Sequence, residues 1–148
     1  MPVDFNSTAI ADSTSAGLTD TGLSFIAKAG RLHTFRAQLV LLSAATTTGP
    51  AVAVDTPASP TLFTAKAEAP ISTTAGTDAI EEEATVTDAE QMTFTTALST
   101  QGTIVIIEGA IIPSVAGEVK IQFNTEVNGS AVTYKGGKLE FTDLGIAA

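Results

Sequence analysis

Apolar and polar side chains alternate along several stretches of the chain, which is the pattern of β-strands with one buried face. The clearest stretch spans residues 118–127. Its odd-numbered positions hold Val119, Ile121, Phe123, Thr125 and Val127, and its even-numbered positions hold Glu118, Lys120, Gln122, Asn124 and Glu126. No segment longer than a few residues shows helical periodicity. The pattern therefore predicts an all-β protein.

Turn residues divide the alternating pattern into about eight strands. Residues 23–29 alternate before a turn at Gly30, and we expect strands at 32–42, 51–55, 61–67, 90–99, 103–113, 118–127, 131–135 and 138–144. In the first of these strands, one face holds Phe35, Ala37, Leu39 and Leu41 and is predicted to be buried, and the opposite face holds Arg36 and Gln38. Asn128-Gly129 predicts a tight hairpin because both residues tolerate positive φ, and Gly136-Gly137 predicts a second turn. Short strands at this spacing in 148 residues favour a single antiparallel sandwich or a jelly-roll-like domain.

Residues 103–113 are apolar at both odd and even positions. A strand of this kind is expected to be buried on both faces. Two apolar faces exceed what a small two-layer sandwich has to bury, and closed symmetric assembly is the common way to cover the surplus. We therefore predict self-association as a trimer, with Ile104, Ile106 and Ile111 as candidate interface residues.

Residues 1–22 differ from the rest of the chain, because large apolar side chains are sparse among Ser, Thr, Ala, Asp and Gly. The segment is predicted to be an extended N-terminal arm, and residues 23–148 the β-domain. Its large side chains are too few to offset the cost of ordering the segment within one domain. Phe5, Ile10 and Leu18 are therefore candidate contacts with a neighbouring subunit, and a terminus that never orders is the alternative.

Residues 69–89 are predicted to be a long, exposed connection, because they combine Gly and Pro with threonines and three consecutive glutamates. The acids within residues 78–90 could gather a cation such as calcium. They lack the alternating spacing and central glycine of an EF-hand loop. A solvated acidic loop is the expectation, and no metal site is predicted.

The charge of the chain narrows the range of partners. Its net charge is −9, and only 16% of its residues are charged. A nucleic-acid-binding surface needs clustered Lys and Arg, so no nucleic acid is expected. No apolar run reaches the length of a membrane span, and the start lacks the features of a signal peptide. We expect a protein made in the cytoplasm that does not bind membranes.

Candidate catalytic chemistry is sparse. His33 is the only histidine, and the sequence has no Gly-x-Ser-x-Gly motif whose serine His33 could activate as a general base. Gly136-Gly137-Lys138 lacks the first glycine and the hydroxyl residue of a phosphate-binding loop. Sugar binding commonly uses exposed aromatic rings, and the chain has no Trp and the single Tyr134. We expect a protein without catalytic activity and without a cofactor.

Several segments carry a recognisable family pattern. They are IEGAIIP at 107–113, KIQFNTEV at 120–127, GSAVT at 129–133 and KGG at 135–137, with Gly117 between the first two and Thr34-Phe35-Arg36 earlier in the chain. Over residues 23–146 the chain resembles a family of small tailed-phage proteins, some of which are capsid decoration (cement) proteins with a tulip-shaped β-domain.

The resemblance implies a homotrimer on the outer capsid surface of the virion, where it clamps neighbouring subunits of the major capsid protein against internal pressure. A phage tail or fibre-associated β module is the alternative, because such proteins share these β patterns. A sugar-binding adhesion domain is a more distant one.

Overall fold

Eleven strands and no helix make up the part of the chain that the computed structural model describes, which is residues 2–45, 47–70, 80–94 and 102–146. The strands are β1 (Val3–Asn6), β2 (Ile10–Asp12), β3 (Thr19–Ala27), β4 (Arg31–Ser43), β5 (Pro50–Asp55), β6 (Leu62–Pro70), β7 (Ile80–Thr85), β8 (Met92–Thr93), β9 (Thr103–Ile112), β10 (Gly117–Thr125) and β11 (Val132–Ile146). The prediction of an all-β protein is confirmed. No helix in these residues could span a membrane.

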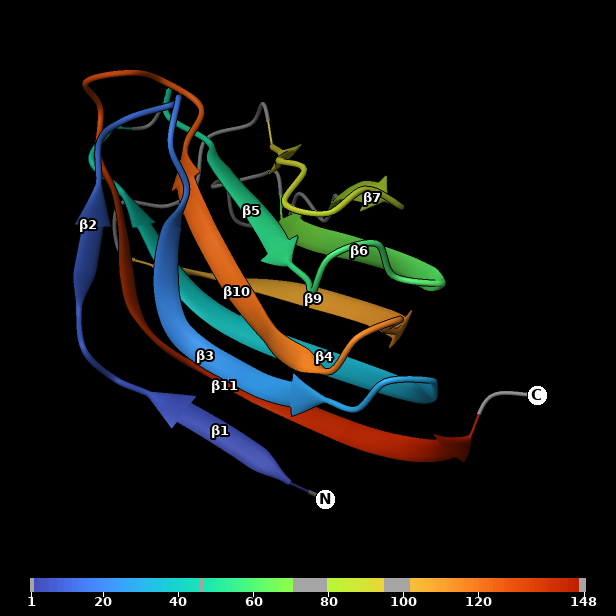
Figure 1. Ribbon diagram of the computed structural model, residues 1–148. Coiled ribbons are helices and arrows are strands. Elements are labelled where there is room, and N and C mark those ends of the chain that lie inside the picture. Colours follow the sequence, from blue (N-terminus) through green and yellow to red (C-terminus); the bar gives the residue numbers. More distant parts are fainter. Residues whose placement is uncertain (1, 46, 71–79, 95–101, 147–148) are drawn as a thin grey trace.

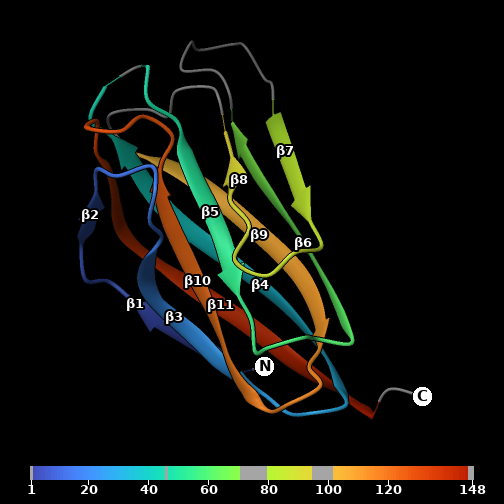
Figure 2. The same ribbon diagram turned by 45° about the horizontal axis from the view of Figure 1, so that its top comes forward.

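The strands form two antiparallel sheets that pack face to face as a sandwich (Figure 1). The seven-stranded sheet has the order β1-β11-β4-β9-β6-β7, and β2 also pairs with β11. The four-stranded sheet has the order β3-β10-β5-β8. In Figure 2, β3, β10 and β5 lie in front of β11, β4 and β9, so one layer covers the other.

The core lies between the two sheets and is built from the alternation seen in the sequence. On β4, Phe35, Ala37, Leu39 and Leu41 are buried, as predicted. Phe25, Phe35 and Phe141 form one aromatic group of this core, in which the Phe25 ring stacks on Phe141 with 4.8 Å between ring centroids. Burial of these apolar side chains is the main contribution to the stability of such a sandwich.

Two turn predictions in the second half of the chain are wrong. Asn128-Gly129 does not close a hairpin, because β10 and β11 belong to different sheets. Gly136-Gly137 lies inside β11, so the strands expected at 131–135 and 138–144 are one strand. A Cβ at position 137 would lie 2.4 Å from the Gln38 carbonyl oxygen. Glycine is therefore needed there for a close approach of two strands and not for a turn.

The segment predicted as a connection over 69–89 contains a further strand. β7 pairs with β6 over six residues, from Ala65↔Thr85 to Pro70↔Ile80. Alternation fails to indicate this strand because it lies at the sheet edge and only its last residue, Thr85, is buried, so neither face carries a row of apolar side chains. Residues 71–79, like residues 95–99 of the strand expected at 90–99, lie outside the described residues.

The N-terminal segment belongs to the sandwich, which corrects the expectation of a separate arm over residues 1–22. β1 and β2 both pair with β11, and β3 runs across the expected boundary between Gly22 and Leu23 (Figure 1). Polar contacts hold the segment where apolar ones are sparse. The Tyr134 hydroxyl donates to the Asn6 carbonyl at 2.7 Å, and Asp4 accepts from the Ser24 amide at 3.0 Å.

Candidate protein-binding face

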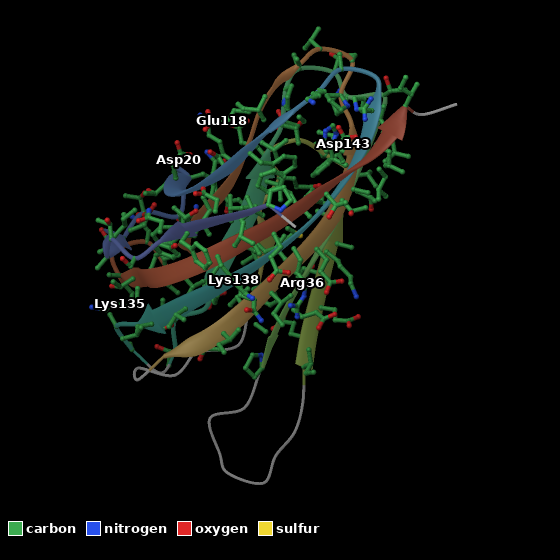
Figure 3. The ribbon with its side chains drawn as sticks, turned by 90° about the horizontal axis from the view of Figure 1, so that it is seen from below. Asp20, Arg36, Glu118, Lys135, Lys138 and Asp143 are labelled. Atoms are coloured by element: carbon green, nitrogen blue, oxygen red, sulfur yellow. The ribbon has the colours of Figure 1, made fainter. Side chains whose placement is uncertain are left out.

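The outer surface of the seven-stranded sheet carries exposed apolar and charged side chains side by side, and no other described part of the chain covers them. Directly paired residues of antiparallel strands point to the same side of a sheet. The pairings Glu140↔Arg36, Arg36↔Glu108 and Glu108↔Lys66 therefore set four charged side chains in a line across β11, β4, β9 and β6. We call these four residues the charged row. Figure 3 shows the strands of this sheet side by side, with Arg36 labelled on β4.

A second line of residues runs beside the charged row. It comprises Lys138, Gln38, Ile106 and Glu68, which are also paired from strand to strand. Phe5 of β1 pairs with Lys138 and extends this line to the sheet edge, where its side chain is 70% exposed. Lys138 is labelled beside Arg36 in Figure 3.

Ion pairs link neighbouring charges within this face. Arg36 Nε lies 3.1 Å from Glu108 Oε1, and Lys138 Nζ lies 2.7 Å from Glu140 Oε1. The hydrogen bond from Lys138 holds the pKa of the Glu140 carboxyl below its usual range. Lys66, 3.0 Å from Glu68, lowers the pKa of that carboxyl in the same way. Ion pairs this exposed add little stability, but they place a positive charge beside Glu68, Glu108 and Glu140.

Apolar side chains lie at both ends of the face. At one end Val40 pairs with Ile104, and these side chains are 39% and 55% exposed. At the other end Leu62 pairs with Ile112, and Leu62 is also exposed. Exposed apolar side chains rimmed by polar ones are typical of surfaces that bind other proteins.

The centre of the face is a shallow hollow of about 660 Å³. Small side chains leave this space. They are Thr34, Thr64, Ala110 and Thr142, with Arg36, Lys66, Glu108 and Glu140 beside them. The hollow lies over Gly109, which itself is needed because a Cβ there would lie 2.4 Å from the Phe35 ring beneath. A hollow this open can receive side chains of a partner but encloses no small molecule.

The expectation that β9 is buried on both faces is wrong within this chain. Val105, Ile107 and Ile111 point inward and are fully buried, whereas Ile104 is exposed and Ile106 is half-buried on the outer side. The apolar surplus of this strand is therefore on the outer face.

The structure brings together three of the six candidate interface residues. Phe5, Ile104 and Ile106 share the outer face of the seven-stranded sheet. Ile111 is buried in the core and cannot contact a partner, which corrects its assignment. Ile10 packs against the core, and Leu18 is half-buried just before β3.

Sequence reasoning missed the charged row and the apolar ends of this face. The sequence pattern predicts that Arg36 and Gln38 lie opposite the buried side of their strand, and the structure confirms that orientation. The alignment of Arg36 with Glu108, Lys66 and Glu140 depends on the register of four strands that are distant in sequence. No local pattern carries that information.

The outer surface of the four-stranded sheet has a different character. Lys120 Nζ lies 3.8 Å from both Asp20 and Asp55. Burial raises the pKa of Asp55, and the nearby Asp88 charge raises it further. Part of this surface is covered by the chain itself, because the buried Asn124 amide donates to the Gly17 carbonyl at 3.1 Å.

His33 has a structural environment. Its side chain is buried, its Nδ1 lies 3.0 Å from the Arg31 carbonyl, and its Nε2 accepts from the Lys28 amide at 3.4 Å. The ring also contacts Phe25, with 6.0 Å between centroids. Among the described residues, no group of three or more His, Asp or Glu side chains is placed to hold a metal ion. Asp78, at the start of the acidic stretch, lies outside them.

No protein-family model matches the chain, and a search of curated proteins found no match either.

Proposed function

We propose that the chain is a structural protein that acts by binding other protein subunits and has no catalytic role. The observation that carries this proposal is the outer face of the seven-stranded sheet, where compensated charges lie between two exposed apolar ends. Such a face loses less on desolvation than a face of unpaired carboxylates would, because Glu68, Glu108 and Glu140 already have cationic neighbours. A groove with a buried nucleophile and base, which a hydrolase would need, does not occur among the described residues.

We propose further that the assembly to which the protein belongs is a tailed-phage capsid, and that the protein decorates the outside of the shell. This step rests on the resemblance of residues 23–146 to the decoration family. A protein that binds only the assembled shell stabilises that shell by mass action. Cementing the shell against internal pressure requires no chemistry and no cofactor, and it is compatible with an acidic chain that does not bind DNA.

Electron cryo-microscopy of particles that contain the protein tests its location. We expect copies distributed over the whole shell, in contact with the major capsid protein. Density confined to the tail or its vertex would replace this proposal with the tail or fibre module. No density on the particle would contradict both.

Particles made without the protein test its purpose. We expect them to release their genome at a lower temperature than complete particles, measured by dye access to DNA during heating. Adding the purified protein back should restore the higher temperature. Equal release temperatures would contradict a cementing role even if the protein lies on the shell.

A further inference from the structure

The charges on the outer face of the seven-stranded sheet reverse sign across the line between β4 and β9. Arg36 and Glu108 lie next to this line, on β4 and β9, and carry opposite charges. Glu140 and Lys66 lie one strand further out on each side, on β11 and β6, and again carry opposite charges. The charged row is therefore antisymmetric about the midline.

The neighbouring line of residues repeats this relation. Lys138 and Glu68 occupy the outer positions on β11 and β6 and carry opposite charges, and the inner positions hold the uncharged Gln38 and Ile106. Three cation–anion pairs thus occupy equivalent places on the two sides of one line.

We propose that this face binds the same face of a second copy of the chain, around a two-fold axis that runs parallel to the strands and lies over the midline between β4 and β9. Rotation by half a turn about such an axis exchanges the two sides of the midline and keeps each line of residues at its own height. Arg36 then faces Glu108 of the second copy, and Lys66 faces Glu140 of the second copy. Each contact occurs twice, as in every isologous interface.

The same axis also brings the apolar ends of the two faces together. Val40 faces Ile104 of the second copy at one end, and Leu32 faces Ile112 at the other, so apolar side chains meet apolar ones. Two sheets with the same twist stack with their strands nearly aligned, which is the arrangement this axis produces. The long side chains of the charged row can enter the central hollow of the second copy. At the margin, Phe5 of β1 faces Glu82 of β7, where the carboxylate stays at the solvent rim.

Charge also selects this axis over the competing one. A two-fold axis perpendicular to the strands through the charged row would set each of these charges opposite its own copy, which is repulsive. The face holds three of the chain's seven basic residues, Arg36, Lys66 and Lys138, beside Glu68, Glu108 and Glu140. It is thus nearly neutral in a chain of net charge −9, so two acidic molecules can meet there.

This dimer differs from the homotrimer implied by the family resemblance, and it does not depend on a capsid. Sedimentation velocity on the full chain, from about 1 to 100 µM, measures its association. We expect a monomer–dimer equilibrium. A monomer over the whole range, or a trimer, would overturn the proposal. Neither result bears on where the protein lies on particles, which microscopy tests separately.

A charge exchange between Lys66 and Glu140 tests the geometry. Lys66→Glu and Glu140→Lys should each weaken dimerisation at least about tenfold, because each places like charges face to face. The two changes together should restore the dissociation constant to within about threefold. β6 and β11 are three strand spacings apart, about 14 Å, which exceeds the screening length of about 10 Å at 0.1 M salt. Rescue must therefore come from contact between copies.

Two features keep this test decisive. The single variants change the net charge in opposite directions, so a general charge effect cannot weaken both. Lys120→Glu on the other sheet is the matched control and should leave association unchanged. If a single variant loses its wild-type circular dichroism spectrum, the Lys138→Glu and Glu68→Lys pair provides the same exchange between the same two strands. Failure of the double variants to recover dimerisation would contradict the proposed axis.

Discussion

The two outer faces of the sandwich are built from the same alternation of residues, yet they differ in how their charges are arranged. On the seven-stranded sheet Glu68, Glu108 and Glu140 each have a cation beside them. The pKa values of Glu68 and Glu140 are lowered by their lysine partners. On the four-stranded sheet Lys120 alone lies between Asp20 and Asp55, and the pKa of Asp55 is raised. The charges of the first face are nearly balanced, whereas the second face would repel an acidic partner.

The two faces also differ in what covers them. Residues 13–18 lie over one end of the four-stranded sheet, where Gln91 donates to the Ser15 carbonyl at 3.4 Å and the buried Ala51 lies beneath. The seven-stranded sheet has no such cover in the described part of the chain, and Ile104 stays exposed. The N-terminal segment thus completes one face and only widens the other, through β1 and β2. The bare face is the one that we propose as an interface.

Removal of residues 2–18 should have the largest effect, because it abolishes the difference in cover between the two outer faces. The deletion takes β1 and β2 from one sheet and the covering loop from the other, and leaves β3 whole. The buried Tyr134 hydroxyl would lose its acceptor, and Asn124 would lose the Gly17 carbonyl, each at a cost of about 1–3 kcal/mol. We expect the free energy of unfolding to fall by about 3 kcal/mol or more.

Urea denaturation followed by circular dichroism measures this loss. Ala9→Ser, an exposed change in the same segment, is the control and should shift stability by less than about 0.5 kcal/mol. An unchanged midpoint in the truncated protein would show that the segment is only a terminus, as the alternative interpretation of the sequence holds.

Ile104→Asp and Ile26→Asp compare the two faces with the same substitution. Ile104 lies on the outer side of the seven-stranded sheet and Ile26 on that of the four-stranded sheet, with exposures of 55% and 66%. In the proposed dimer a carboxylate at position 104 faces Val40 of the second copy, where it cannot keep its hydration. We expect dimerisation to weaken by about 100-fold for Ile104→Asp and to be unchanged for Ile26→Asp, by sedimentation velocity. Equal effects would remove the distinction between the faces.

Sequence alone predicts those parts of the fold in which one face of a strand is buried and the other is not. β4 and β10 were predicted with the correct inward residues because their core sides are filled by Phe35, Leu39, Ile121 and Phe123. The sequence pattern predicts two strands in place of β11 because consecutive glycines usually indicate a turn. Gly137 instead allows β11 to approach the Gln38 carbonyl, and the Leu23 side chain lies close to Gly137. Such a requirement belongs to the tertiary structure and leaves no local pattern.

The candidate site was predictable only in part. Phe5, Ile104 and Ile106 stand out in the sequence as apolar residues that the domain does not need for its core. The outward side of Ile104, unlike the inward side of Ile111, follows from the pairing of β9 with β4 and β6. The antisymmetry of the charges depends on the same pairings. Residue types therefore suggested an interface, and register decided which residues form it.

The smallest expected effect concerns single carboxylates of the two sheets. The pKa of Asp55 is raised, first by burial and then by Asp88. Its ionised form is therefore less favourable in the folded protein, and stability falls as pH rises from the unfolded value of 3.8 through the folded pKa. Asp55→Asn should stabilise the protein at pH 7, by less than about 0.5 kcal/mol. The difference should vanish as the pH falls below that unfolded value.

Asp143 of the seven-stranded sheet should show the opposite sign. The hydrogen bond from Arg31 lowers its pKa, with a further contribution from the Gly145 amide. The stability it contributes is present above the unfolded value and is lost as the pH falls through the folded pKa. Asp143→Asn should therefore destabilise the protein at pH 7, and this difference should also shrink in acid. Melting temperatures of the wild type and of both variants from about pH 3 to 7 give the difference between each variant and the wild type, and the slope of that difference against pH is the quantity compared. Slopes of the same sign would contradict the electrostatic contrast between the two sheets, because only opposite environments move the two carboxyl groups in opposite directions.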